Sequence, residues 1–109
     1  MKAISVRQPF ALQIILGKKP YEYRSWLPPQ PLVGQRLAIH ASKLDAAARD
    51  ELERLRLPLI GGVVLGSVRL VAVRRTRRND GWWAWVLDDP QPLRRPVPAT
   101  GKLRIWEWR

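Results

Sequence analysis

The predicted order of helices and strands indicates an α+β fold, a barrel or a curled sheet of about six strands with two helices. Both helices are expected in the first half of the chain, and the second half contains only strand patterns. This order differs from the regular alternation of strands and helices in a Rossmann unit. The 109 residues are enough for one domain, residues 1–109, and show no linker or internal repeat.

The first predicted elements are a short strand, a short helix and a second strand. Lys2 to Val6 has the apolar pattern of a strand, and a helix is expected from Pro9 to Leu16. Proline suits the first helical position, where its missing N–H is no loss, and Gly17 supplies the left-handed residue that ends the helix. The helix is apolar on nearly all sides, which predicts that it is buried. The aromatic residues of Tyr21 to Trp26 then favour a strand.

A proline-rich connector and a second helix follow. Pro28 to Pro31 predicts a stiff, extended connector, which leads into a strand at Arg36 to Ala41. Ser42 and Asp45 have the spacing of a capping box, with Ser42 as the N-cap. Apolar residues then recur with helical period at Ala48, Leu52 and Leu55. This pattern predicts an amphipathic helix with a charged outer face.

The second half of the chain has the pattern of a β-structure. Val63 to Arg74 is a long β-branched run, and Gly66 inside it indicates a bend or a bulge. The sequence Asn79-Asp80-Gly81 predicts a turn. Two further strands are expected at Trp83 to Leu87 and at Leu103 to Trp108, with a proline-rich loop between them.

The net charge is strongly positive. Twenty Lys and Arg residues oppose nine acids, which gives +11 at pH 7. Every charged residue from Arg56 to Arg78 is an arginine, whereas acids gather between Asp45 and Glu53. Such a balance favours polyanionic partners, because each phosphate contact releases a counterion. The alternatives are a generic solvated surface or the arginine-rich composition of a thermophilic protein.

The composition argues against several classes of site and location. The chain has no cysteine, which excludes disulfides, thiol nucleophiles and cysteine-zinc sites. With a single histidine, a zinc site is not expected either, and no cofactor is predicted. The first residues lack the apolar core of a signal peptide, and no apolar run approaches the roughly 18 residues that span a bilayer. We therefore expect a cytoplasmic protein without a membrane partner, a monomer by default.

The junction between the first strand and the first helix is one candidate site. Arg7 and Gln8 lie where a strand end enters a helix N-terminus, so unpaired N–H groups and a cation are expected together. Such a junction can hold a phosphate. The alternative is that Arg7 is a solvated charge and Gln8 a helix cap.

A second candidate lies in the Tyr21 to Trp26 strand. Alternate side chains share one face of a strand, so Glu22, Arg24 and Trp26 are expected to point together, with Lys19 at the strand entrance. A carboxylate, a guanidinium and an indole can accept from a base amino group, bind phosphate and stack on a ring. The alternative is a surface ion pair beside a core tryptophan.

Two further groups of residues are candidates. His40 and Ser42 lie at the end of a strand, where hydrogen-bonded structural roles are the alternative. Arg74 and Arg75 precede the predicted turn, and Trp82 follows it. Arginines interleaved with aromatic residues suit single-stranded nucleic acids, in which bases stack and phosphates pair with cations. Core tryptophans and solvated arginines are again the alternative.

Together these motifs resemble the ASCH (activating signal cointegrator homology) domain family of the PUA-like superfamily. The resemblance rests on segments spread in order over nearly the whole chain: Ser5 to Ala11, Gly17-x-Lys19-x-x-Glu22-x-Arg24-x-Trp26, Ile39 to Ser42, Gly61 to Val68, Trp85, Pro96 and Gly101 to Trp106. It implies a PUA-like mixed β-barrel with two helices packed at the barrel openings. It also implies a cleft beside the barrel, lined by Arg7-Gln8, Lys19, Glu22, Arg24, Trp26 and the segment from His40 to Ser42.

The resemblance favours nucleic-acid binding as the function. Related domains are associated with RNA, and some with DNA or with enzymatic activity. We expect binding of single-stranded RNA, or of one exposed or modified base, with single-stranded DNA as a further possibility. The acidic outer face of the second helix leaves a protein-interaction module as another hypothesis.

An enzymatic role is the alternative that the resemblance leaves open. One branch of the family hydrolyses the amide of N4-acetylcytidine with a Lys, a Thr nucleophile and a Glu. Lys19 corresponds to that lysine, but Glu22 stands at the threonine position and the glutamate has no clear counterpart. A carboxylate there can act as a general base on water, not as a hydroxyl nucleophile. A nucleoside amidohydrolase or a ribonuclease would therefore use Lys19 and Glu22 as its catalytic pair.

Overall fold

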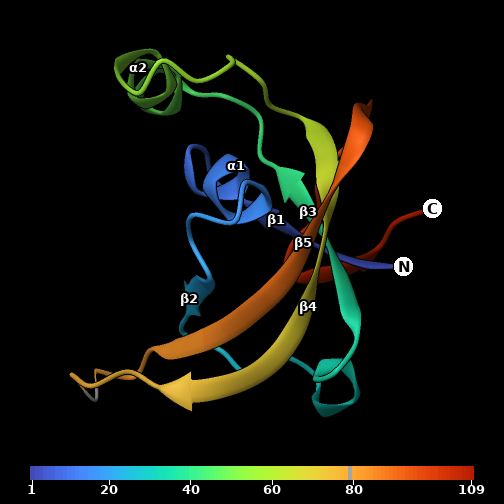
Figure 1. Ribbon diagram of the computed structural model, residues 1–109. Helices are drawn as coiled ribbons and strands as arrows, with labels where there is room; N and C mark the ends of the chain where they lie inside the picture. The colour runs from blue at the N-terminus through green and yellow to red at the C-terminus, as the bar shows by residue number, and fades with distance from the viewer. Residues whose placement is uncertain (79) are drawn as a thin grey trace.

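The computed structural model describes residues 1–78 and 80–109. Over these residues six strands form one mixed sheet in the spatial order β2-β5-β4-β3-β1-β6, accompanied by two α-helices (Figure 1). The strands are β1 (Lys2–Val6), β2 (Tyr21–Arg24), β3 (Arg36–Ala41), β4 (Val63–Arg75), β5 (Trp83–Pro98) and β6 (Ile105–Glu107). The helices are α1 (Phe10–Ile15) and α2 (Ala46–Arg54), and a 3₁₀ turn, η1, covers Gln30–Leu32. The predicted α+β class is confirmed.

The sheet curls into a half-barrel around α1. β1 and β3 are parallel, with Ile4 opposite Ile39, and the other pairs are antiparallel. The long strands β4 and β5 bend together, and α1 lies on their concave side, where it packs against β1, β3, β4 and β5 (Figure 1). The strands β2 and β6 form the two edges of the sheet in the described residues. The half-barrel therefore has an open seam between these edges.

Both faces of the sheet carry apolar residues. The main core lies on the concave face, between α1 and the strands, and includes Ile4, Leu37, Leu70 and Trp85. A smaller cluster on the other face contains Ala3, Ala38, Val64 and Trp106. β3 is therefore buried on both sides. In the described part of the chain, neither helix is long and apolar enough to cross a membrane.

The helix predictions are confirmed in position and corrected in detail. α1 lacks one residue at each predicted end, and Gly17 follows it with a positive φ of 78°. The expectation that α1 is buried holds for Ala11, Ile14 and Ile15, whereas Phe10 at its start and Leu16 just after its end are exposed. The N-cap of α2 is Asp45, not Ser42: the Asp45 carboxylate accepts from the Ala48 N–H at 2.8 Å.

The proline-rich segment after Leu87 is strand, not the predicted loop. β5 continues through Pro98 and pairs with β4 along most of this length. Its other neighbour, β2, pairs only with residues Trp83 to Val86. Beyond them one side of β5 has no strand partner in the described residues, so a proline that cannot donate a hydrogen bond is tolerated there. Proline content alone therefore misassigned this half of β5.

Three other boundaries differ from the sequence predictions. β2 ends at Arg24, so Trp26 lies beyond the strand. The connector expected to be fully extended contains the η1 turn before Gly34. The last strand is shorter than Leu103 to Trp108, and Leu103 is exposed to solvent. The predicted turn includes Asn79, which lies outside the described residues.

Gly66 allows the bend of the half-barrel, as the sequence predicted. The register of β4 shifts here against both neighbouring strands. The shift lies between Ile39 and His40 in the pairing with β3, and between Val64 and Gly66 in the pairing with β5. A Cβ atom at Gly66 would collide with the Gln91 carbonyl oxygen and lie 2.7 Å from Pro92 Cα. Backbone of the neighbouring strand therefore occupies the space that any side chain would need.

We predict that Gly66→Ala lowers the free energy of unfolding by about 2 kcal/mol or more, because the β5 backbone has to move. Gly34→Ala is the matched control. Gly34 also has a positive φ, of 91°, but no atom lies within 4 Å of its added Cβ. The control should lose only the backbone strain of about 1 kcal/mol. Urea denaturation measures both, and equal losses would contradict the role assigned to Gly66.

Candidate nucleic-acid interface

Five of the predicted site residues line one cleft on the concave side of the half-barrel. The cleft has a volume of about 460 Å³ and lies between the start of α1, β2 and the segment that follows β3. The predicted residues on its wall are Arg7, Glu22, Arg24, Trp26 and Ser42. The other lining residues are Ser5, Val6, Phe10, Tyr23, Ser25 and Trp82. Segments that are far apart in the sequence thus meet at this cleft.

β2 places its alternate side chains as the period of a strand requires. Glu22 is buried and Arg24 half-buried, whereas Tyr21 and Tyr23 are exposed. Glu22 lies opposite Trp85 of β5 in the β2–β5 register. The Trp26 ring meets the buried Trp85 ring edge to face, with centroids 4.9 Å apart. Packing against the core thus fixes the indole at the cleft wall.

Glu22 holds two cations, one in the cleft wall and one beside the cleft. Its Oε2 accepts from Arg24 Nε at 2.8 Å, and its Oε1 lies 3.5 Å from Lys19 Nζ. Arg24 also donates to the main-chain oxygen of Ser5 at 2.8 Å. Lys19 Nζ donates to the Tyr21 carbonyl at 2.6 Å. The charges of the cleft are therefore fixed in position by one another.

Lys19 adjoins the cleft but does not line it. Its ammonium lies 5.3 Å from the ring centroids of both Phe10 and Tyr23, which do line the cleft. A cation over an aromatic face is attracted by the ring quadrupole. Phe10 and Tyr23 thus hold the Lys19 charge beside the opening. Strand periodicity did not identify either ring.

Arg7 lies at the rim of the cleft, where it pairs with Asp45, the N-cap residue of α2. Its guanidinium makes a bidentate ion pair with the Asp45 carboxylate, and one of the two bonds is 2.8 Å long. The hydrogen bond from Arg7, followed by that from the Ala48 N–H, holds the pKa of Asp45 below its ordinary value of 3.8. The same pair raises the pKa of Arg7. The contribution of the Asp45 carboxylate to the stability of the folded protein is therefore complete above about pH 4. It is lost as the pH falls through the pKa of Asp45 in the folded state.

Gln8 and His40 lie away from the cleft and make structural hydrogen bonds. Gln8 is 1% exposed, accepts from the Leu12 N–H and donates to the Ile60 carbonyl. His40 is 2% exposed, and its Nε2 lies 2.7 Å from the Ala99 carbonyl, which can only accept. The Ser5 hydroxyl lies 3.0 Å from His40 Nδ1. His40 borders a separate cavity of about 550 Å³.

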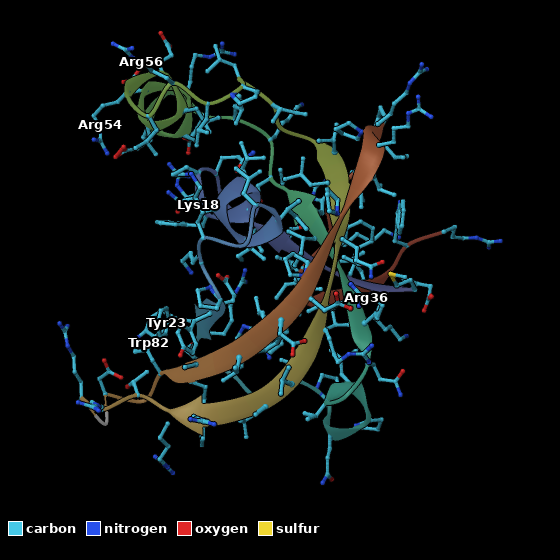
Figure 2. The ribbon with its side chains drawn as sticks, in the orientation of Figure 1. Lys18, Tyr23, Arg36, Arg54, Arg56 and Trp82 are labelled. Atoms are coloured by element: carbon cyan, nitrogen blue, oxygen red, sulfur yellow. The ribbon has the colours of Figure 1, made fainter. Side chains whose placement is uncertain are left out.

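Arg74 and Arg75 line a different groove, which adjoins the cleft. This groove has a volume of about 730 Å³ and lies along the β4–β5 hairpin. Tyr23 and Trp82 belong to the walls of both hollows. Figure 2 shows these two side chains next to each other beside β2 and the start of β5. The structure thus places the two arginines near the cleft but not within it.

Sequence reasoning missed Arg104 altogether. Its guanidinium lies 4.8 Å from the centroid of the Trp26 ring, a cation–π contact that covers part of the indole. Arg104 precedes β6 and has a positive φ of 55°. No local pattern pointed to it, because its partner is distant in the sequence and lies across the seam of the half-barrel.

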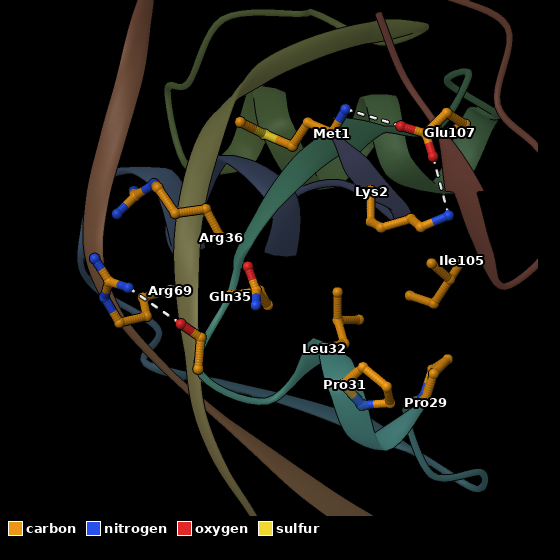
Figure 3. A pocket seen from close by; sticks show the side chains of 11 residues that line it. Met1, Lys2, Pro29, Pro31, Leu32, Gln35, Arg36, Arg69, Ile105 and Glu107 are labelled. Carbon is orange, nitrogen blue, oxygen red and sulfur yellow. Dashed lines mark hydrogen bonds and ion pairs between the residues drawn. The ribbon is translucent and has the colours of Figure 1, made fainter.

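A larger cavity of the described residues lies elsewhere and contains none of the predicted site residues. It has a volume of about 950 Å³ and lies between η1, the start of β3 and β6 (Figure 3). Its walls are mainly apolar, and its charged residues bond within the chain: Lys2 to Glu107 at 2.9 Å and Arg69 to the Gly34 carbonyl at 3.2 Å. Among the residues described there is also no cluster of side chains suited to a metal ion.

Comparison with known proteins identifies the family. Residues 4–87 match the ASCH domain. The chain belongs to the ASCH domain family. This family has a PUA-like fold and is associated with RNA binding or processing. The match confirms the resemblance inferred from the motifs.

Solved structures support the fold of this ASCH domain. The crystal structure of ASCH from Zymomonas mobilis aligns with a TM-score of 0.69 and 22% identity, over 99% of this chain and 87% of that one. Two single-substitution variants of the Zymomonas protein align with TM-scores of 0.67 and 0.68, each at 20% identity and over 99% of this chain; the alignments cover 87% and 89% of the variants. A search of curated proteins finds no match. At these identities the likeness extends to the fold alone.

We predict that Glu22→Gln lowers the free energy of unfolding by about 2 kcal/mol, because it leaves two poorly hydrated cations without their counter-charge. Glu51→Gln is the matched control. Both glutamates lie 2.7 Å from an arginine, but the Glu22 and Arg24 side chains are 11% and 23% exposed, against 42% and 68% for Glu51 and Arg54. The exposed pair should contribute less than about 0.5 kcal/mol. Losses of similar size in urea denaturation would show that the cleft charges are not coupled.

Proposed function

We propose that this ASCH domain binds single-stranded RNA by holding one exposed or modified base in the cleft beside α1. The observation that carries the proposal is the meeting of Arg7, Glu22, Arg24 and Trp26 at one hollow of about 460 Å³. The net charge of +11 agrees with a polyanionic partner. The RNA-associated family supports the same class of ligand.

Each group of the cleft has a role that fits its chemistry. The Trp26 indole offers a surface for a base, because stacking is favourable for every base. Glu22 has acceptor positions beyond those used by Arg24, so it can accept from a base amino group. Arg7 at the rim can pair with a phosphate. Recognition of a splayed-out base in this way is typical of single-stranded RNA.

The free protein already contains a competitor for the phosphate. Asp45 occupies the Arg7 guanidinium in a bidentate ion pair. A phosphate that binds Arg7 has to displace this carboxylate or share the guanidinium with it. The affinity for RNA therefore depends on how strongly Asp45 holds Arg7.

We predict that Asp45→Asn increases the affinity for an RNA octanucleotide. Asparagine caps a helix as well as aspartate does, so α2 should be retained, while Arg7 loses its charged partner. One additional phosphate contact should steepen the plot of log affinity against log salt by about 0.7. Fluorescence anisotropy across a KCl titration measures both quantities, and a DNA octamer of the same sequence compares the two backbones.

Two controls accompany this experiment. In the double variant Arg7→Gln/Asp45→Asn the gain should disappear, because the freed cation is absent. The difference in stability between wild type and Asp45→Asn should narrow as the pH falls below 3.8, where the wild-type carboxyl also loses its charge. If the wild type shows no affinity for RNA or DNA at low salt, or a flat salt dependence, the proposed function is wrong.

A hydrolase acting on a modified nucleoside or on RNA is the second candidate. It is favoured by the contact between Lys19 and Glu22, which are 3.5 Å apart and only 22% and 11% exposed. An ammonium and a carboxylate at this distance can act as an acid–base pair on a bound water and a leaving group. Against this role, Glu22 also pairs with Arg24 at 2.7 Å.

We predict no turnover of N4-acetylcytidine or of single-stranded RNA by the wild type. The reason is that Glu22 is paired with Arg24 and accepts a hydrogen bond from the base instead of activating a water. Chromatography of the reaction products after prolonged incubation tests this. Release of cytidine or of shorter RNA that is lost in Lys19→Ala but retained in Lys18→Ala would favour the enzyme instead. Lys18 is the matched control because it is the exposed neighbour of Lys19.

A further inference from the structure

The groove along the β4–β5 hairpin carries exposed aromatic rings. Tyr21 and Tyr23 project from the outer face of β2 and stack on each other, with centroids 6.4 Å apart and planes inclined by 29°. Trp82 lies in the same groove, directly before β5. All three rings are more than 40% exposed. Aromatic rings that the fold leaves exposed in a hollow are available for stacking with a ligand.

The same groove is rich in arginine. Arg74, Arg75, Arg77 and Arg78 line it. The guanidinium of Arg75 lies over the Trp83 ring, 4.8 Å from its centroid. Asp80 is the acid among the lining residues. The groove thus combines a cluster of positive charge with flat apolar surfaces.

Asp80 is occupied by its own turn. Its Oδ1 accepts from the Thr76 hydroxyl at 2.7 Å and from the Trp82 N–H at 3.1 Å. These hydrogen bonds, that of Thr76 first, hold the pKa of Asp80 below 3.8. The carboxylate therefore shapes the base of the hairpin loop and leaves an excess of cations in the groove.

The groove and the cleft form adjoining parts of one surface. Tyr23 and Trp82 line both, and Figure 2 shows them side by side where β2 meets the hairpin. A chain that leaves the cleft past these two rings enters the groove directly. The arginines of β4 and of the hairpin loop then lie along its path.

We propose that the groove binds the continuation of the single strand whose exposed base occupies the cleft, an inference that rests on the proposed function. Tyr21, Tyr23 and Trp82 stack with flanking bases, and the hairpin arginines pair with the phosphates between them. A single strand fits this surface because it can present both base faces and phosphates to one groove. A duplex hides the base faces, so it would leave the three rings without partners.

In this arrangement the cleft and the groove have different roles in binding. The cleft selects one base through Glu22 and Trp26, while the groove adds affinity that is independent of sequence. RNA long enough to reach from the cleft into the groove should therefore bind much more tightly than a trinucleotide. Its binding should also depend more steeply on salt, because more phosphates are contacted.

The test compares a trinucleotide and an octanucleotide RNA of mixed sequence on three proteins. The groove variant is Tyr21→Ala/Arg77→Ala/Arg78→Ala. The charge control is Arg94→Ala/Arg95→Ala, which removes two adjacent exposed arginines from the far part of β5. All five substituted side chains are exposed, so each variant should fold. Circular dichroism and thermal unfolding check this.

We expect the groove variant to lose about tenfold or more in affinity for the octanucleotide. The salt slope should fall by about 1.4, for two lost phosphate contacts with a single strand. Binding of the trinucleotide and all binding by the charge control should stay close to wild type. These results together support a track that continues from the cleft.

Other outcomes overturn the inference and separate it from the proposed function. Equal losses in the groove variant and the charge control would show a general effect of net charge. An unchanged octanucleotide affinity in the groove variant, with Asp45→Asn still increasing it, would reject the groove and leave cleft binding intact. Failure of wild type to bind any RNA or DNA at low salt would reject both.

Discussion

The candidate cleft depends on the hydrogen bond by which Arg24 joins the two sides of an unclosed barrel. The guanidinium extends from β2, at one edge of the sheet, to the Ser5 carbonyl of β1, near the other edge. Ser5 lies just beyond the residues of β1 that pair with β6, since the last of these is Ile4. Its carbonyl is therefore within reach of a side chain. Backbone hydrogen bonds between two strands would have left no space between these edges. A bridging side chain holds the edges together and leaves the space that forms the cleft.

The seam is held by charges that are themselves paired. Glu22 orients Arg24, and Arg104 covers the ring of Trp26 from the segment before β6. Arg24 is half-buried, and an unpaired cation there would be costly, so its guanidinium needs the Glu22 carboxylate and the Ser5 carbonyl. The same requirement fixes the positions of the groups that a ligand would meet. Fold stability and preorganisation of the site thus come from one set of contacts.

The sequence predicted local elements well and their three-dimensional relations less well. β1 and β3 were predicted at their observed bounds, because their apolar patterns are continuous and clearly ended. It was harder to predict which face of a strand lines the cleft. The strand period places His40 and Ile39 on opposite faces but does not say which face meets the cleft, and His40 lies on the face away from it. Ser42 and Asp45 are both good caps, and the choice depended on how far the β-pairing continues, since the Ser42 N–H still donates to the Val6 carbonyl.

The placement of the charges favours different parts of the ligand at different depths. Inside the cleft, the Glu22 carboxylate already has two cations as partners, Arg24 in the cleft wall and Lys19 beside it. Both cations are therefore engaged, whereas the remaining acceptor positions of Glu22 suit the amino group of a neutral base. At the rim, Arg7 has a carboxylate partner that is exposed to solvent, so exchange for a phosphate leaves no buried charge unpaired. The base should therefore enter the cleft and the phosphate should stay at its edge, which is the order that a single strand with one splayed-out nucleotide presents.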